Sequence, residues 1–276
     1  MIYTALMNAD DNSISASRRD PALRSEPAVA LAKHSTTAHT PQARSRRSYD
    51  DGCAAAHALD LVGERWALLV VRELLLGPRR FSDLRQTLGG ISPNVLSQRL
   101  ADLEAADILR RRQLPPPAAC HVYGLTPWGL MLEPVILELL KWGVRSPGFQ
   151  RGQPLSADAM ALSFKAMYDP ELAAGFDCRI TLIMNHHAYH LAIGQGLLAV
   201  ARGEPPCHPG DAASWAAAVL QAAPVVVLQL AYGNRPLAQA QAVGDCQHSG
   251  DTDTLLRFLS CFRVPPAIPA AAACYD

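Results

Sequence analysis

The segment from residue 81 to residue 103 constrains the fold of this chain more than any other. Gly89 and Gly90 interrupt an apolar pattern at a point where the backbone can take a positive φ without hindrance from a side chain. Ser92, a good helix cap, and Pro93, a residue favoured at the first helical position, follow directly. The pattern therefore predicts two short helices joined by a tight glycine turn.

The second of these helices has an apolar stripe and an uncharged polar face. Leu96, Leu100 and Leu103 recur at helical spacing. The opposite face carries Asn94, Ser97, Gln98 and Ala101. Asparagine and glutamine can form paired hydrogen bonds with an adenine edge in the major groove of DNA. The face therefore suits a helix that reads bases, although an ordinary amphipathic helix pair would show the same stripe.

A strand, a loop and a return strand are predicted after the second helix. Residues 108–113 and 119–125 have strand character and flank a run of prolines, so we expect a hairpin wing. Alternation along the first strand sends the arginines at 110–112 to both faces, and at least one face can meet phosphate. Arg79 and Arg80, ahead of the helix pair, offer a second phosphate anchor. The alternative is that these arginines only keep an exposed edge from aggregating.

The region from residue 53 to residue 145 resembles HxlR-type winged helix-turn-helix transcriptional regulators. The motifs GERW, RELLLGPRRFSDLR, GISPNVLSQRL and YGLTP occur in order after a cysteine at the start of the region. The resemblance implies a mainly α winged helix-turn-helix domain, residues 49–147, that binds a near-palindromic double-stranded DNA operator as a dimer. The residues that we expect to contact DNA are Arg79, Arg80, Ser92, Asn94, Ser97, Gln98, Arg99 and Arg111.

The resemblance also implies that the first helix, residues 54–61, and the last, residues 127–144, form the interface of a homodimer. The last helix is compatible with this role, because it carries more apolar surface than one small domain can hide. Its apolar residues include Leu130, Pro134, Leu137, Leu140 and Trp142. A heterodimer, or a core that covers the helix from within the chain, would explain the same surface.

The chain as a whole has the length and composition of a globular protein with two domains. Its formal net charge is zero, so affinity for DNA must come from placed arginines rather than from bulk charge. Residues 1–48 lack apolar periodicity, and we expect either a disordered extension or a misassigned start, without a signal peptide. The longest apolar stretch, residues 222–232, is too short to span a bilayer. We therefore expect a cytoplasmic protein with no membrane partner.

The 7 cysteines are scattered without a CxxC pair, which fits a reducing compartment and argues against a zinc site or a disulfide framework. Cys53 stands apart because it heads the first predicted helix, where the helix dipole favours a thiolate. The family resemblance adds that some HxlR-like regulators use a cysteine at this position as a redox sensor. Asp50 and Asp51 disfavour a thiolate, and a small buried hydrophobe is the alternative interpretation of Cys53.

The pattern changes beyond a linker at residues 147–154. Residues 157–168 indicate a helix capped by Ser156, and a helix, a short strand and a helix close the region. Strands are expected at residues 178–184, 188–193, 197–202 and 225–230. The fold class predicted for residues 155–266 is therefore an α+β domain with an antiparallel sheet, and residues 267–276 are expected to form a tail.

Residues 155–266 resemble the sterol-carrier-protein-like domains that are fused behind such regulators. The resemblance rests on Tyr168-Asp169-Pro170, the Arg202-Gly203-Glu204 turn, Pro236-Leu237-Ala238, and residues 244–251 before Leu255-Leu256-Arg257-Phe258. It implies an apolar cavity between sheet and helices that holds a small apolar ligand. The alternatives are a cavity that is simply core, or a domain that only dimerises.

The sequence contains no P-loop, no GxGxxG after a strand, no nucleophile elbow and no carboxylate pair, and we expect neither an enzyme nor a bound cofactor. His186, His187 and His190 resemble a metal cluster, but no carboxylate lies within the segment and one histidine is expected to point away. We expect no metal site there. The sequence thus favours a DNA-binding transcriptional regulator. A lipid-binding carrier whose N-terminal domain only dimerises is the alternative.

Overall fold

The structure, a computed structural model, describes residues 48–116, 119–150, 152–203 and 216–269. All of these residues fall within one compact unit, Arg46–Asp276. The predicted extension at residues 1–48, apart from Ser48, and most of the predicted tail at 267–276 lie outside the described residues. Among the described helices, none has both the length and the apolar character needed to cross a membrane.

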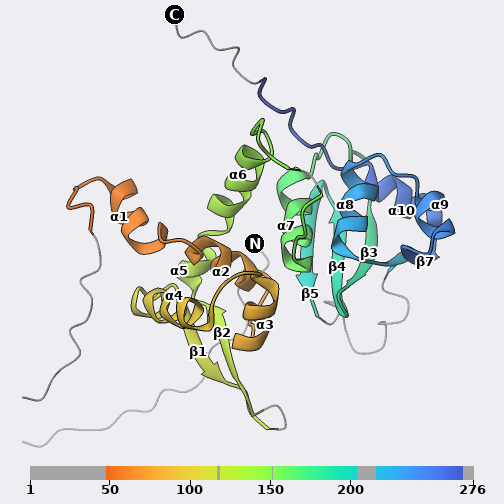
Figure 1. Cartoon of the computed structure of the whole chain (residues 1–276). Coiled ribbons are helices and arrows are strands. Elements are labelled where there is room, and N and C mark those ends of the chain that lie inside the picture. Colours follow the sequence, from red (N-terminus) through yellow and green to blue (C-terminus); the bar gives the residue numbers. More distant parts are fainter. Residues whose placement is uncertain (1–47, 117–118, 151, 204–215, 270–276) are drawn as a thin grey trace, which may run out of the picture. The chain divides into compact units, whose positions relative to one another are not determined.

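The first part of the described chain combines helices with a two-stranded hairpin (Figure 1). Its elements are α1 Ala54–Val62, α2 Ala67–Leu74, α3 Phe81–Thr87, α4 Pro93–Ala105, β1 Leu109–Gln113, β2 His121–Leu125, α5 Pro127–Leu130 and α6 Glu133–Gly143. Strands β1 and β2 pair antiparallel, with Leu109 opposite Leu125. The backbone of Arg79 also forms an isolated antiparallel bridge to Tyr123 in β2. A winged helix-turn-helix results, as the sequence predicts.

The turn between α3 and α4 forms for the reasons visible in the sequence. Gly90 adopts a φ of 87°, which glycine reaches without strain. Ser92 Oγ accepts a hydrogen bond from the Val95 N–H at 3.3 Å and so caps α4. Leu96 and Leu100 are buried in the core of this part. The leucine stripe of α4 therefore points inward and leaves the polar face exposed.

The predicted last helix, residues 127–144, is broken into the separate helices α5 and α6. Thr126 Oγ1 accepts a hydrogen bond from the Gly129 N–H at 3.0 Å and caps α5. A Cβ atom on Gly129 would stand 2.0 Å from the Ile108 carbonyl oxygen. Only glycine therefore lets α5 lie this close to the start of the hairpin.

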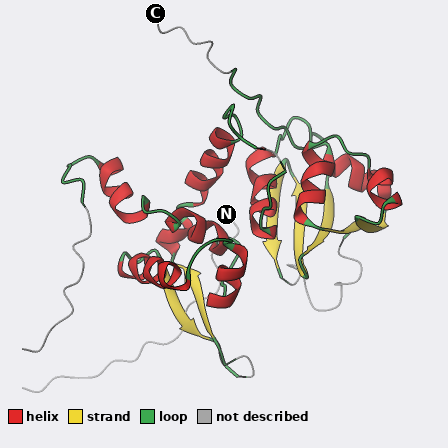
Figure 2. Ribbon diagram, viewed as in Figure 1, coloured by secondary structure: helices red, strands yellow, loops and turns green. Residues whose placement is uncertain are grey.

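The second part of the described chain is a five-stranded sheet with helices packed on it (Figure 2). Its elements are α7 Ala157–Met167, β3 Cys178–Met184, β4 His187–Gly194, β5 Leu197–Arg202, β6 Ala218–Ala222, α8 Pro224–Tyr232, α9 Leu237–Ala242, β7 Cys246–Gly250 and α10 Thr252–Leu259. The strand order is β5-β4-β3-β6-β7. Asn185 and His186 have φ values of 49° and 65° and form the tight turn between β3 and β4.

Two expectations for this part are wrong. The sheet is not purely antiparallel, because β6 runs parallel to β3, with Leu182 opposite Leu220. The strand expected at 225–230 is part of helix α8, which has Pro224 at its first position. A short apolar run can form either a buried helix or a buried strand, and Pro224 at the first position favours the helix. Strand β6, which precedes α8, was not expected.

The side chains between the sheet and the helices form one packed core. Phe164 of α7 lies 5.6 Å from Phe258 and 4.6 Å from Phe262, measured between ring centroids. The cluster includes apolar side chains of α7, β3, β4 and α10: Phe164, Met167, Ile180, Leu182, Leu191, Ile193 and Phe258. These residues fill the space between sheet and helices as core, which is one of the alternatives left open by the sequence.

Candidate nucleic-acid interface and the buried clamp behind it

The polar face of α4 is open to solvent. Asn94, Ser97 and Gln98 are all exposed. The side chain of Gln98 donates a hydrogen bond to Asp102 at 2.9 Å, one turn further along the same helix. This bond holds the amide on the exposed face without burying it. Three of the expected base-reading or DNA-contacting residues therefore lie together on one accessible helix face.

Two further expected residues on α4 have partners within the protein. Ser92 uses its hydroxyl to cap the helix, as described above. The side chain of Arg99 is only 16% exposed and forms ion pairs with Asp102 at 3.0 Å and Glu64 at 3.7 Å. Arg99 is therefore turned toward its neighbours in this arrangement rather than toward the open face.

The exposed arginines lie at the start of α3 and on the wing. Arg80 is exposed directly before α3. Arg111 is exposed on β1, and its backbone N–H donates to Glu104 at 2.9 Å. The charge of Arg110 is neutralised by an ion pair with Asp107 at 3.1 Å, so Arg111 is the better placed of the two arginines to bind an anion. Arg80 and Arg111 are thus available for phosphate.

Arg79 does not fit the expectation of a phosphate anchor, because its side chain is only 4% exposed. Its guanidinium binds Asp158 of α7, with Nε at 3.1 Å and Nη2 at 2.6 Å from the same carboxylate oxygen. Neighbouring residues on an extended backbone point to opposite sides, so one of Arg79 and Arg80 had to turn inward. The sequence carries no signal for which one, nor for a partner so far along the chain.

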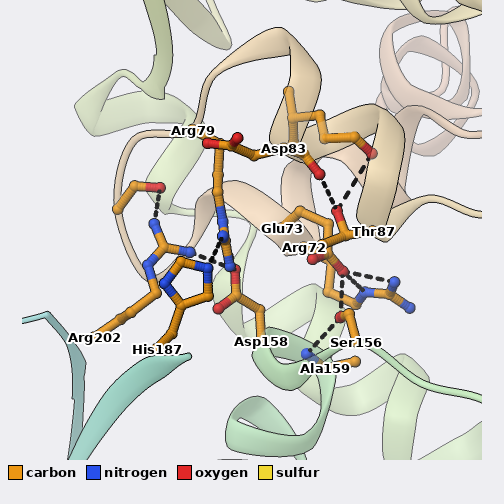
Figure 3. A network of polar contacts seen from close by, with 12 residues as sticks. Arg72, Glu73, Arg79, Asp83, Thr87, Ser156, Asp158, Ala159, His187 and Arg202 are labelled. Carbon is orange, nitrogen blue, oxygen red and sulfur yellow. Dashed lines mark hydrogen bonds and ion pairs between the residues drawn. The ribbon is translucent and has the colours of Figure 1, made fainter. Parts of the chain in front are cut away.

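Asp158 is the centre of a buried polar cluster (Figure 3). The carboxylate is completely buried and accepts hydrogen bonds from Arg79, from Arg202 Nη1 at 2.5 Å and from Tyr189 Oη at 2.7 Å. Arg202 Nη2 also donates to the carbonyl oxygens of Gly77 and Pro78, both at 3.0 Å. We call Arg79, Asp158, Tyr189 and Arg202 the clamp.

The pKa values of the groups around the clamp shift in the directions expected for burial beside charge. Burial, and then the neighbouring Asp158 charge, raise the pKa of Tyr189, which stays a neutral hydrogen-bond donor. His187 lies beside the clamp, with Nε2 at 3.3 Å from Arg79 Nη1. Burial, followed by the charges of Arg79 and Arg202, lowers the pKa of His187 below its ordinary value of 6.5.

A second buried acid lies close to the clamp. Glu73 of α2 is fully buried and accepts hydrogen bonds from Ser156 Oγ at 2.7 Å and from Arg72 at 2.7 Å. Ser156 also caps α7 by accepting the Ala159 N–H at 3.0 Å. The start of α7 is therefore bonded to α2 through one serine hydroxyl.

Cys53 is exposed at the start of α1, so it is not a buried hydrophobe. The backbone N–H groups of Ala55 and Ala56 lower the pKa of its thiol, as a helix N-terminus does for an anion. By contrast, burial raises the pKa of the Cys178 thiol to about 11. Of these two thiols, Cys53 is the one suited to react.

The three histidines do not gather around a common point. His186 lies in the β3–β4 turn, His187 faces Arg79, and His190 bonds Thr181 at 3.0 Å from the neighbouring strand. Within the described ranges, no group of three or more histidine, cysteine, aspartate or glutamate side chains is arranged to hold a metal ion.

Comparison with known proteins places the chain in a family. The family model described as HxlR-like helix-turn-helix matches residues 61–148. The regulator YvaP of Bacillus subtilis is 38% identical over 85 residues, which are 31% of this chain and 79% of that protein. This chain belongs to the HxlR-like helix-turn-helix family of transcriptional regulators.

Other relatives of this HxlR-like regulator match over a similar share of the chain. The regulator YodB of Bacillus subtilis is 36% identical over 85 residues, which are 31% of this chain and 76% of YodB. The solved structure of reduced YodB is 33% identical and covers 35% of this chain and 95% of that one, with a TM-score of 0.32.

The position of His187 in this HxlR-like regulator predicts loss of stability in acid. The groups around its ring are Arg79 and Arg202, opposed by Asp158 and Asp83. Because folding lowers its pKa, the stability it contributes is present above pH 6.5 and is lost as the pH falls below that value. We expect the urea midpoint to fall between about pH 7.5 and about pH 5, and to fall less in His187→Gln. A matched His121→Gln change, at an exposed position, should leave the pH dependence unchanged. An equal fall in wild type and His187→Gln would contradict the assignment.

Proposed function

We propose that this regulator binds double-stranded operator DNA as a homodimer, with α4 in the major groove and the β1–β2 wing on the backbone. The observation that carries the proposal is the face of α4, where Asn94, Ser97 and Gln98 stand exposed above a buried leucine stripe. Amide side chains near the start of such a helix can specify bases. Arg80 and Arg111, both exposed, supply phosphate contacts. The protein would act in the cytoplasm, where its operator is.

The homodimer is supported by apolar side chains that the described chain leaves uncovered. On α6 and the turn before it, Met131, Val135, Leu139 and Trp142 are exposed, and Trp142 is 74% exposed. Large exposed apolar residues in one region mark an interaction site. Leu59 is exposed on α1, the other helix that the family resemblance assigns to the interface. Leu137 and Leu140, in contrast, pack against the core of the second part of the chain.

The second part of the chain, residues 155–266, is proposed as a regulatory domain of the sterol-carrier-like type behind a DNA-binding domain at 49–147. Its α+β architecture is compatible with that type. Its inward-facing apolar residues are packed in one cluster, so a small apolar effector would have to open this core in order to bind. The packing favours a regulatory role over the alternative of a lipid carrier.

Cys53 is proposed as a thiol switch, because it is exposed and the pKa of its thiol is lowered. In the presence of glutathione, diamide should join the Cys53 thiol and a glutathione thiol in a mixed disulfide and itself take up the two hydrogens. This oxidation should release the operator from wild-type protein, and Cys53→Ser should keep its DNA complex under the same treatment. Gel shift measures both. Cys178→Ser, which removes a buried thiol, is the control and should respond as wild type does. Release of operator from Cys53→Ser by diamide would rule the switch out.

Base reading by α4 is tested at Gln98. Gln98→Ala should cost about 1 to 3 kcal/mol of binding free energy on an operator selected from the upstream intergenic DNA, and little on random DNA. Arg111→Ala should weaken both complexes and flatten the salt dependence of binding. Gln247→Ala, an exposed amide in β7, is the matched control and should change neither. Equal weakening of both complexes by Gln98→Ala would remove Gln98 from base reading.

Dimerisation is tested at the exposed face of α6. Trp142→Ser removes the most exposed large apolar side chain of that helix, and we expect it to raise the dimer dissociation constant about tenfold or more, as loss of a central aromatic contact does. Light scattering over a dilution series measures this. Leu256→Ser changes an exposed leucine of α10 and serves as the control. If wild type is monomeric at all concentrations, the homodimer proposal fails.

A further inference from the structure

The clamp connects the second part of the chain to the segment that begins the DNA-reading elements. Arg79 lies two residues before α3, next to the helix cap Arg80, and its backbone is bonded to Tyr123 of the wing. The Arg79 N–H donates to the Tyr123 carbonyl at 3.0 Å, and the Tyr123 N–H donates to the Arg79 carbonyl at 2.8 Å. The residue that Asp158 binds is therefore also bridged to the wing through its backbone.

Arg202 binds the same segment at a second place. Its guanidinium bonds Asp158 through Nη1 and the carbonyl oxygens of Gly77 and Pro78 through Nη2. Two arginines, one from each part of the chain, thus share one carboxylate around residues 77–79. This segment joins α2 to α3 and is fixed by its backbone and by its only buried side chain, Arg79.

The charges explain why this arrangement has one preferred geometry. Arg79 and Arg202 both bond the Asp158 carboxylate, whose third donor is the Tyr189 hydroxyl, and Glu73 is a second negative charge near both arginines. Asp158 has no exposure to water, so neither it nor Arg79 can replace a lost partner with solvent. A displacement of α7 must therefore carry Arg79 with it or leave buried charge uncompensated.

We infer that Asp158 is a positioning residue through which the second part of the chain sets the geometry of the wing and of α3. This inference rests on the proposed DNA-binding function, and it names the route of regulation. The covalent connection between the two parts of the chain runs through the linker at residues 147–154. The clamp bypasses that linker, because it joins α7 and β5 directly to residues 77–79. Any ligand or modification that moves α7 therefore changes the affinity for DNA, and DNA binding shifts the position of α7 by the same coupling.

The test uses Asp158→Asn in the full chain. The asparagine keeps the shape of the side chain and removes its charge, which leaves Arg79 and Arg202 facing each other. We expect hydrogen exchange at the Arg79 and Tyr123 amides to become at least tenfold faster, and the Kd for the selected operator to rise about tenfold. Asp245→Asn is the matched control, because Asp245 forms an ion pair with Arg235 within the second part of the chain. It should change neither quantity.

A second variant covers the case in which Asp158→Asn does not fold. Arg202→Lys keeps the positive charge and can still pair with Asp158, but its single nitrogen replaces two nitrogens, of which Nη1 bonds Asp158 and Nη2 bonds the carbonyl oxygens of Gly77 and Pro78. We expect it to speed exchange at the Arg79 and Tyr123 amides by a smaller factor, with unchanged exchange in β3 and β4.

The outcomes separate this inference from the proposed function. Unchanged exchange at Arg79 and Tyr123 in both folded variants overturns the clamp as a positioning device. Faster exchange with unchanged or tighter operator binding overturns its role in DNA reading. If wild-type protein binds no operator, the proposed function fails, and the role of the clamp in DNA reading falls with it. The exchange measurement, which needs no DNA, then still decides whether Asp158 holds the wing.

Discussion

A carboxylate that is cut off from water must be surrounded by donors, and Asp158 meets this requirement with groups drawn from three places in the chain. Arg79 comes from the connection between α2 and α3, Tyr189 from β4 and Arg202 from β5. None of these donors is near Asp158 in sequence. The buried charge of Asp158 is therefore compensated only where α7, β4, β5 and the connection between α2 and α3 meet. The hydrogen bond between Ser156 and Glu73 reinforces the same junction from the N-terminal end of α7.

Local features of this fold could be predicted from the sequence, because they depend on interactions between near neighbours. The cap at Ser92, the positive φ of Gly90 and the inward leucine stripe all follow from residue type and spacing. Strands β3 and β5 begin and end at the predicted residues for the same reason. The exposed face of α4 can be predicted too, because it consists of the residues opposite the buried leucine stripe.

Features that depend on distant partners could not be predicted. The apolar run of α8 predicts a strand, because a run of that length can be buried either as a strand or as a helix. The parallel pairing of β6 with β3 depends on a crossover that no local pattern encodes. Arg79 and Arg80 are identical in residue type and adjacent in sequence, yet one is buried against Asp158 and the other is exposed. Only the position of α7 distinguishes them.

Helix α6 has two apolar faces with different neighbours. Leu137 and Leu140 belong to the packing of the second part of the chain, whereas Val135, Leu139 and Trp142 are exposed. Many multidomain proteins can be recombined by cutting at the connection between their domains, because each piece keeps its own core. Here a cut at residues 147–154 would strip Leu137 and Leu140 of their cover and leave Asp158 without Arg79. A working chimera with another regulator would need to transplant α6, α7 and residues 77–79 together, so the unit of exchange is larger than the sequence linker suggests.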